Sequence, residues 1–251
     1  MSYRSPAEQA TLDRLLAADV GTGRLVAYGD HPDQIVEWWG EEGPVVALVH
    51  GGYFRAAVDR THARPMAAAI AQRGYRVALV EYRRIAGEPD ASLTDLRILA
   101  ERLHREGLAV GAWIGHSAGG TLVLLLALKG LGTPALALAP VVDLARNAEA
   151  GLGDDAVTEW MDGLPGEIDG YHRVDPAQIL SEKGSPDLTT LGIRLLVPMD
   201  DTTVPPEHCS DLGLPFVAVP GAHHFDVVDP ESEHFGTTLA LIREHVTPGT
   251  A

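Results

Sequence analysis

Apolar runs of strand length alternate with amphipathic segments along most of this chain. The runs predict eight strands, over 24–28, 34–39, 44–49, 75–82, 110–114, 135–139, 193–197 and 216–219. Apolar residues at helical spacing predict helices over 58–73, 90–105, 118–129 and 233–245. This alternation is typical of an α/β fold, in which a mostly parallel, twisted sheet of about eight strands carries helices on both faces.

Two parts of the chain depart from the simple alternation. The first two strands are separated only by the turn-rich sequence GDHPD, so we expect them to pair antiparallel. Between Val141 and Leu191 the pattern weakens into Gly, Asp and Pro with short helical pieces. This stretch predicts a small cap or lid around 141–191, inserted into a single domain that spans residues 1–251.

Composition and charge narrow the classes of protein and partner. The charged fraction of 22% and a mean hydropathy of +0.02 are ordinary for a soluble globular protein. The 35 acidic and 19 basic residues give a formal charge of -16, which would repel nucleic acid and an anionic membrane, so we expect neither as a partner. The first 16 residues hold no continuous apolar stretch, so we expect no signal or membrane anchor and, by default, a cytoplasmic location.

The single cysteine, Cys209, excludes an internal disulfide and any multi-cysteine metal site. It lies in no recognisable nucleophile motif, and we expect a structural role for it. In the second predicted strand, Trp38 and Trp39 are neighbours and therefore face opposite sides, so at least one should lie in the core or on the sheet surface.

A possible nucleophile lies at the centre of the chain. Gly115-His116-Ser117-Ala118-Gly119 fits the pattern G-x-S-x-G, and it lies between an apolar strand and an apolar helix. That context is the one in which a serine is held on a strained strand-to-helix turn, with the helix N-terminus directed at it. We therefore predict Ser117 as a nucleophile, and His116 as a packing and hydrogen-bonding residue, since adjacent residues on this turn point apart.

A glycine-rich segment, His50-Gly51-Gly52-Tyr53, directly follows the predicted strand 44–49. Glycine lets the backbone approach a substrate closely, and such a loop can supply an N–H group to a tetrahedral oxyanion. The predicted donors of this oxyanion hole are the N–H of Ala118 and an N–H from Gly52 or Tyr53.

A serine nucleophile needs an imidazole base and a carboxylate that orients it. Two adjacent aspartates follow strand 193–197, and we favour Asp201 over Asp200 because it stands three residues before Val204-Pro205. Asp200 is the alternative, and otherwise a solvated turn residue.

Two adjacent histidines follow strand 216–219. We favour His224 over His223 as the base because an aromatic residue follows it directly. A two-histidine metal site is disfavoured because no third ligand accompanies the pair, and the predicted chemistry requires no metal or organic cofactor.

These motifs together resemble the kynurenine formamidase (arylformamidase) branch of the α/β-hydrolase superfamily, over most of the chain. The resemblance depends on Tyr28-Gly29, His50-Gly51-Gly52-Tyr53-Phe54, Gly115 to Gly120, Ala139-Pro140 with Asp143 and Leu144, and His224-Phe225-Asp226. Tyr53 stands where lipase-like esterases usually carry a third glycine. The resemblance implies the α/β-hydrolase fold and hydrolysis of an N-formyl arylamine, such as N-formylkynurenine, through an acyl-enzyme.

The sequence leaves the pocket lining, the substrate class and the oligomeric state open. Tyr53, Phe54 and Trp160 could line an aromatic-friendly pocket, and Asp143 is expected to cap the helix that follows it rather than shape the pocket floor. The predicted triad of Ser117, Asp201 and His224 also fits a carboxylesterase, a thioesterase, a small peptidase, or an acyl-transferring or cyclising enzyme. It fits a non-catalytic binding protein least well. The expected partner is a small acyl substrate, and the oligomeric state stays open, a homodimer included.

Overall fold

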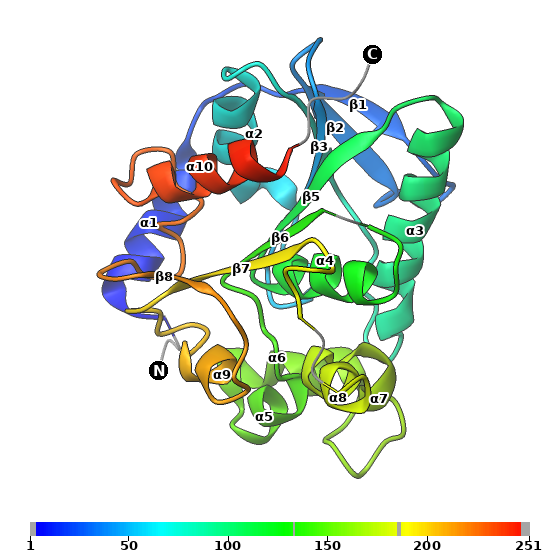
Figure 1. The fold of residues 1–251 in the computed structure, drawn as a ribbon, viewed down its shortest axis with the longest axis vertical. Helices are drawn as coiled ribbons and strands as arrows, with labels where there is room; N and C mark the ends of the chain where they lie inside the picture. Colours follow the sequence, from blue (N-terminus) through cyan, green and yellow to red (C-terminus); the bar gives the residue numbers. More distant parts are fainter. Residues whose placement is uncertain (1–3, 133, 185–186, 247–251) are drawn as a thin grey trace.

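A mixed sheet runs through the described residues, 4–132, 134–184 and 187–246, of the computed structural model (Figure 1). Its eight strands are β1 Arg24–Ala27, β2 Ile35–Trp39, β3 Val45–Val49, β4 Arg76–Val80, β5 Val110–His116, β6 Ala135–Leu138, β7 Ile193–Pro198 and β8 Val217–Val219. They lie in the order β1-β2-β4-β3-β5-β6-β7-β8. β2 is antiparallel to β1 and β4, and the other neighbours are parallel. All eight predicted strands are confirmed, with ends within two residues of the prediction.

Helices cover both faces of the sheet, as the alternation predicted (Figure 1). On one face, α3 (Pro89–Arg105) and α4 (Ala118–Leu128) pack against Val45, Ala47 and Val49 of β3. On the other face, α2 (Arg64–Ala71) and α10 (Phe235–His245) pack against Val46 and Leu48. The 3-10 turn η1 (Arg60–Ala63) leads into α2. Because successive strand residues face opposite sides, a strand buried on both faces is apolar throughout, which is why β3 was readable from sequence.

The adjacent tryptophans follow the same rule. Trp38 is buried in the core that contains α3 and α4, and Trp39 packs against the core on the opposite face. The two indoles therefore extend from opposite sides of β2, as the strand prediction required.

The segment expected to form a cap folds into four short helices. These are α5 Leu144–Glu149, α6 Leu152–Met161, α7 Tyr171–Val174 and α8 Pro176–Glu182, and a further short helix, α9 Glu207–Ser210, follows β7. Val157 and Leu180 belong to the same core as α4, so this segment packs on that face of the sheet. Asp143 accepts a hydrogen bond from the Arg146 N–H (2.9 Å) at the start of α5, which confirms its predicted role as a helix cap.

An N-terminal helix, α1 (Pro6–Ala17), was not predicted. It begins with a capping box: the Ser5 side chain accepts from the Glu8 N–H (3.3 Å), and the Glu8 carboxylate accepts from the Ser5 N–H (2.8 Å). Pro6 at the first helical position lacks the N–H that would otherwise need a partner. The helix is thus well formed locally, although its apolar residues are not concentrated strongly on one face.

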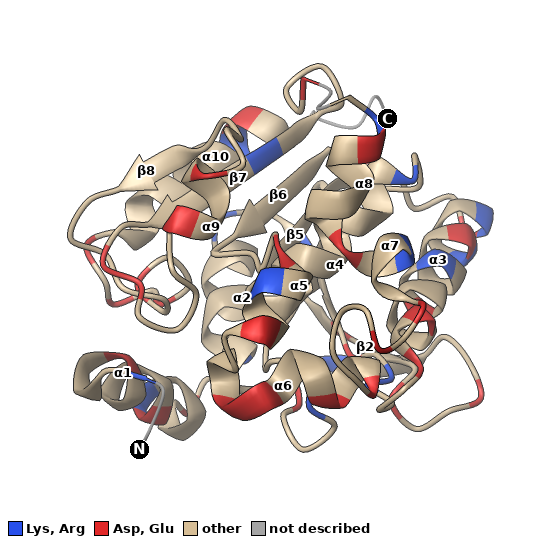
Figure 2. Cartoon of the chain, turned by 90° about the horizontal axis from the view of Figure 1, so that it is seen from below, with Lys and Arg blue, Asp and Glu red and all other residues tan. Residues whose placement is uncertain are grey.

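The acidic residues are spread over the helices and loops (Figure 2). On α6, for example, Asp154, Asp155 and Glu159 are all exposed. In the part of the chain that the structure describes, no helix combines the length and the apolar character needed to cross a bilayer.

Candidate active site

Ser117 occupies the sharp turn between β5 and α4. Its backbone has φ 54° and ψ -122°, a conformation that is strained for any residue with a side chain. A Cβ atom on Gly115 would lie 2.1 Å from the Gly119 carbonyl oxygen, and one on Gly119 would lie 2.2 Å from the Val49 carbonyl oxygen. Only glycine fits at these two positions, so the elbow needs both in order to place Ser117 at the N-terminus of α4.

Asp201 and His224 form a buried pair beside this turn. The His224 Nδ1 lies 2.7 Å from Asp201 Oδ2, and the two residues are 1% and 6% exposed. The other carboxylate oxygen, Oδ1, accepts hydrogen bonds from the N–H groups of Thr203 (2.9 Å) and Val204 (2.7 Å). One oxygen is therefore fixed by the backbone, while the other holds the imidazole in the tautomer that carries a proton on Nδ1.

The two neighbouring candidates point elsewhere. Asp200 is exposed, and its N–H donates to the Ala222 carbonyl oxygen (2.9 Å). His223 Nε2 lies 3.3 Å from Thr11 Oγ1, and its Nδ1 accepts from the Phe225 N–H (3.2 Å). The geometry thus favours Asp201 with His224, the choice made from the sequence, over either alternative.

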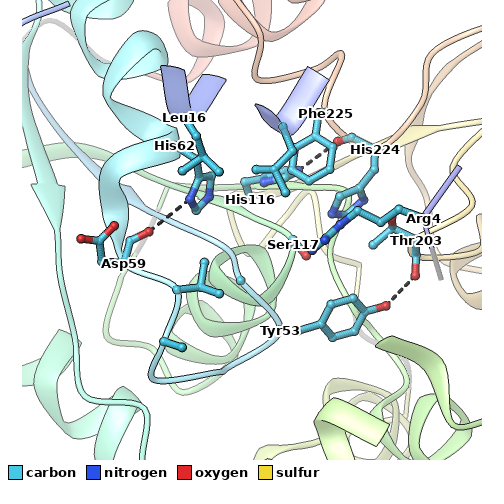
Figure 3. A pocket seen from close by; sticks show the side chains of 14 residues that line it. Arg4, Leu16, Tyr53, Asp59, His62, His116, Ser117, Thr203, His224 and Phe225 are labelled. Carbon is cyan, nitrogen blue, oxygen red and sulfur yellow. Dashed lines mark hydrogen bonds between the residues drawn. The ribbon is translucent and has the colours of Figure 1, made fainter. Parts of the chain in front are cut away.

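Ser117 and His224 open onto one cavity of about 210 Å³ (Figure 3). In the described residues no hydrogen bond joins the two side chains, and such bonds are often long before a substrate binds. Much of the lining is apolar and comes from Leu12, Leu16, Val58 and Phe225. None of the lining residues comes from 141–191, so α1, and not the segment expected to act as a lid, supplies part of the cavity wall.

The loop after β3 passes directly against Ser117. A Cβ atom on Gly51 would lie 2.9 Å from the Ser117 Cβ, and one on Gly52 (φ 122°) would lie 2.6 Å from the Val58 Cγ1. Tyr53 also has a positive φ (51°), lines the cavity, and donates its hydroxyl to the Thr203 carbonyl oxygen (2.5 Å). The predicted oxyanion residues Gly52 and Tyr53 therefore lie at the cavity with Ser117, and Ala118, fully buried, directly follows the serine.

Two residues expected in the pocket lie outside it. Phe54 and Trp160 stack on each other, with ring centroids 3.9 Å apart and planes 8° from parallel. Both are nearly fully buried, and neither lines the cavity. Because Phe54 follows Tyr53 on a backbone with positive φ at both residues, its ring turns away from the cavity and into the core beneath α6.

Two histidines that line the cavity, His62 and His116, are held neutral by burial. His116 Nε2 donates to the His224 carbonyl oxygen (2.9 Å), and desolvation lowers the pKa of His116 well below its ordinary value. His62 Nδ1 lies 3.1 Å from the Asp59 carbonyl oxygen, and burial lowers the pKa of His62 to about 3. His116 therefore fixes the backbone of the His224 loop, consistent with its predicted packing role.

A buried ionic cluster under the loop after β3 was not anticipated from the sequence. His50 Nε2 lies 3.0 Å from Glu81 Oε1, and Nδ1 of the same ring lies 2.6 Å from the Gly51 carbonyl oxygen. Burial by itself would raise the pKa of Glu81, but the charges of His50 and Arg84 outweigh it and lower this pKa. The cluster anchors the loop from below.

Two further sequence predictions concern reactive groups. Cys209 is buried, and desolvation raises the pKa of its thiol to about 12, consistent with a structural role. Within the described ranges no group of three or more His, Cys, Asp or Glu residues is arranged to hold a metal ion.

Comparison with known proteins identifies the fold of this chain. No family model and no curated protein sequence matches the chain. Solved structures do match. Esterase B from Lactobacillus rhamnosis has a TM-score of 0.71 at 20% identity, covering 95% of this chain and 91% of that one. The chain has the α/β-hydrolase fold.

Other matches with the same fold carry similar names. A bacterial heroin esterase has a TM-score of 0.66 at 22% identity, covering 96% of this chain and 90% of that one. A hyperthermophilic esterase from the archaeon Pyrobaculum calidifontis has a TM-score of 0.65 at 20% identity, covering 95% and 88%. At such identities the likeness establishes the fold, and activity must be argued from the site.

Proposed function

We propose that this protein is a serine hydrolase that cleaves small acyl substrates through an acyl-enzyme. The observation that carries the proposal is the buried Asp201–His224 pair, which opens onto the same cavity as Ser117 on its strained turn. The esterase names of its fold neighbours support the proposal.

The proposed reaction begins with proton transfer from Ser117 Oγ to His224 Nε2 as the serine attacks the acyl carbon. The oxygen of the tetrahedral intermediate accepts hydrogen bonds from the N–H of Ala118 and an N–H of Gly52 or Tyr53. His224 then protonates the leaving amine or alcohol, and later activates the water that releases the acid. Asp201 keeps the imidazole oriented and stabilises its protonated form throughout.

We propose an N-formyl arylamine as the substrate class, on the resemblance of the segment from His50 to Phe54 to the formamidase branch. A formyl group needs little space beside Ser117, and the apolar wall formed by Leu12 and Leu16 suits an aromatic leaving group. A short-chain carboxylic ester is the second candidate, favoured by the names of the fold neighbours.

Two experiments test the proposal. A fluorophosphonate probe should label the wild-type protein covalently and leave Ser117→Ala unlabelled, while absent or equal labelling would refute a serine hydrolase. A panel should then compare N-formylkynurenine with p-nitrophenyl acetate and butyrate, and a mass-spectrometric analysis of products should distinguish hydrolysis from acyl transfer. Higher kcat/KM on the simple esters would refute the formamidase assignment while leaving the serine hydrolase intact.

A further inference from the structure

Helix α1 contacts the loop that follows β7 and the loop that follows β8. Its Glu8 binds the loop after β7, Thr11 lies 3.3 Å from Nε2 of His223, and Arg14 forms an ion pair with Asp229. Figure 2 shows α1 at the periphery of the molecule, and its Leu15 belongs to the core that contains α2. The contacts join an N-terminal segment to the loops that carry Asp201 and His224.

The Glu8 carboxylate makes the most extensive of these contacts. Glu8 is 0% exposed. Its Oε1 accepts from the N–H groups of Thr202 (2.8 Å) and Thr203 (3.3 Å). Its Oε2 accepts from the Ser5 N–H (2.8 Å) and from the Thr202 hydroxyl. Four donors thus converge on one carboxylate, and three of them belong to the two residues directly after Asp201.

The Thr203 peptide groups connect this carboxylate to the rest of the site. The Thr203 N–H is shared between Glu8 Oε1 and Asp201 Oδ1, which lies nearer at 2.9 Å. The Thr203 carbonyl oxygen accepts from the Tyr53 hydroxyl (2.5 Å). The loop that carries Asp201 is therefore held by α1 on one side and by the loop after β3 on the other.

We propose that Glu8 is a positioning residue, which acts through Thr202 and Thr203 to fix Asp201 against His224 in the productive geometry. The inference rests on the proposed serine hydrolase. A carboxylate suits the task because it accepts hydrogen bonds and donates none, whereas an amide would place N–H atoms against N–H donors. Burial would raise the pKa of Glu8, but the bonds from Thr202 and Ser5 outweigh it and lower this pKa to about 2, so the side chain stays anionic at neutral pH.

The test compares Glu8→Gln with two control variants of the same helix. Asp13→Asn removes an exposed carboxylate whose bond is to Gln9, and Arg14→Gln removes the ion pair to Asp229 without touching the loop of Asp201. For Glu8→Gln we expect kcat on the best substrate to fall about tenfold to hundredfold with KM changed less than about threefold, because small misplacements of catalytic groups are costly. We expect Asp13→Asn to keep kcat within about twofold of the wild type, and Arg14→Gln to lower kcat less than Glu8→Gln does, because its ion pair holds the loop of His224 and not that of Asp201.

A proton NMR measurement distinguishes the loss of positioning from a general destabilisation of the fold. The far-downfield proton NMR resonance of His224 Nδ1–H reports its bond to Asp201, and it should shift or broaden in Glu8→Gln but not in Asp13→Asn. Glu8→Asp, which keeps the charge but is shorter by one methylene, should fall between wild type and Glu8→Gln in kcat and in the resonance. It also serves as the test variant if Glu8→Gln does not fold.

Three results would overturn the inference: a kcat for Glu8→Gln within twofold of the wild type, an equal loss in Arg14→Gln, or an unchanged downfield resonance. If the wild type fails to react with a fluorophosphonate, the proposed function fails instead. The resonance then still decides whether Glu8 positions the Asp201–His224 pair, since it requires no turnover.

Discussion

Glu8 should make the free energy of unfolding depend on pH in a way that can be isolated. Its pKa falls from 4.5 to about 2 in the folded protein. A depressed carboxylate pKa stabilises the fold above the ordinary value, and this stabilisation is lost as the pH falls from about 4.5 towards 2. At about 1.4 kcal/mol per pH unit, the gap corresponds to about 3 kcal/mol at neutral pH.

Glu8→Gln mimics the protonated side chain and cannot titrate. We therefore expect it to lower the free energy of unfolding by about 3 kcal/mol at pH 7, and by about 1.4 kcal/mol at pH 3, relative to the wild type at the same pH. A stability of about 5 to 15 kcal/mol is usual for a domain, so the variant should remain folded at pH 7.

Urea unfolding followed by circular dichroism, at several pH values between 3 and 7, measures this difference. Asp13→Asn is the control, because Asp13 is exposed on the same helix and should shift the curve by less than about 0.5 kcal/mol. A difference between wild type and Glu8→Gln that is below 0.5 kcal/mol at pH 7, or that does not shrink towards pH 3, would refute the reasoning.

Four further outcomes are expected. Asp201→Asn should lower kcat roughly 10⁴-fold while circular dichroism shows an intact fold, because the amide cannot hold the imidazole tautomer. Gly119→Ala should lower the free energy of unfolding by at least about 3 kcal/mol, since its Cβ would lie 2.2 Å from a carbonyl oxygen of β3, whereas Gly236→Ala, with nothing within 4 Å, should be neutral or slightly stabilising in urea. Leu12→Ala should lower kcat/KM for phenyl acetate relative to ethyl acetate by about tenfold, because it removes part of the apolar wall against which an aromatic leaving group packs. Cys209 should react with a maleimide at pH 8 only after unfolding, because burial raises its pKa to about 12.

The central strands were predictable because the sheet is covered there on both faces. β3 and β5 are apolar over nearly their whole lengths, and such short apolar runs bounded by glycine are readable without knowledge of their partners. α1 was missed because its apolar residues form no strong stripe. The capping box formed by Ser5 and Glu8 was the signal that could have identified it.

Residues of the candidate site could be predicted when their role follows from the neighbouring sequence. They could not be predicted when their role depends on the direction of the backbone. Asp201 and His224 were favoured by their immediate neighbours, and the structure places Nδ1 of the histidine 2.7 Å from the carboxylate. Phe54 could not be placed, since only the backbone shows that its ring turns inward to Trp160. Contacts such as His50 with Glu81, between residues far apart in the chain, leave no local pattern at all.

Thr203 is hydrogen-bonded to three other residues near the cavity, and these bonds determine which features of residue 203 must be kept. Its links to Asp201, Glu8 and Tyr53 all use the N–H and carbonyl of the peptide backbone, whereas its own side-chain hydroxyl, buried, has no hydrogen-bond partner among the described residues. Every residue other than proline supplies the same two groups. Because Thr203 is buried and lines the cavity, a side chain of similar or smaller size, such as valine or serine, can replace it and leave these three links in place.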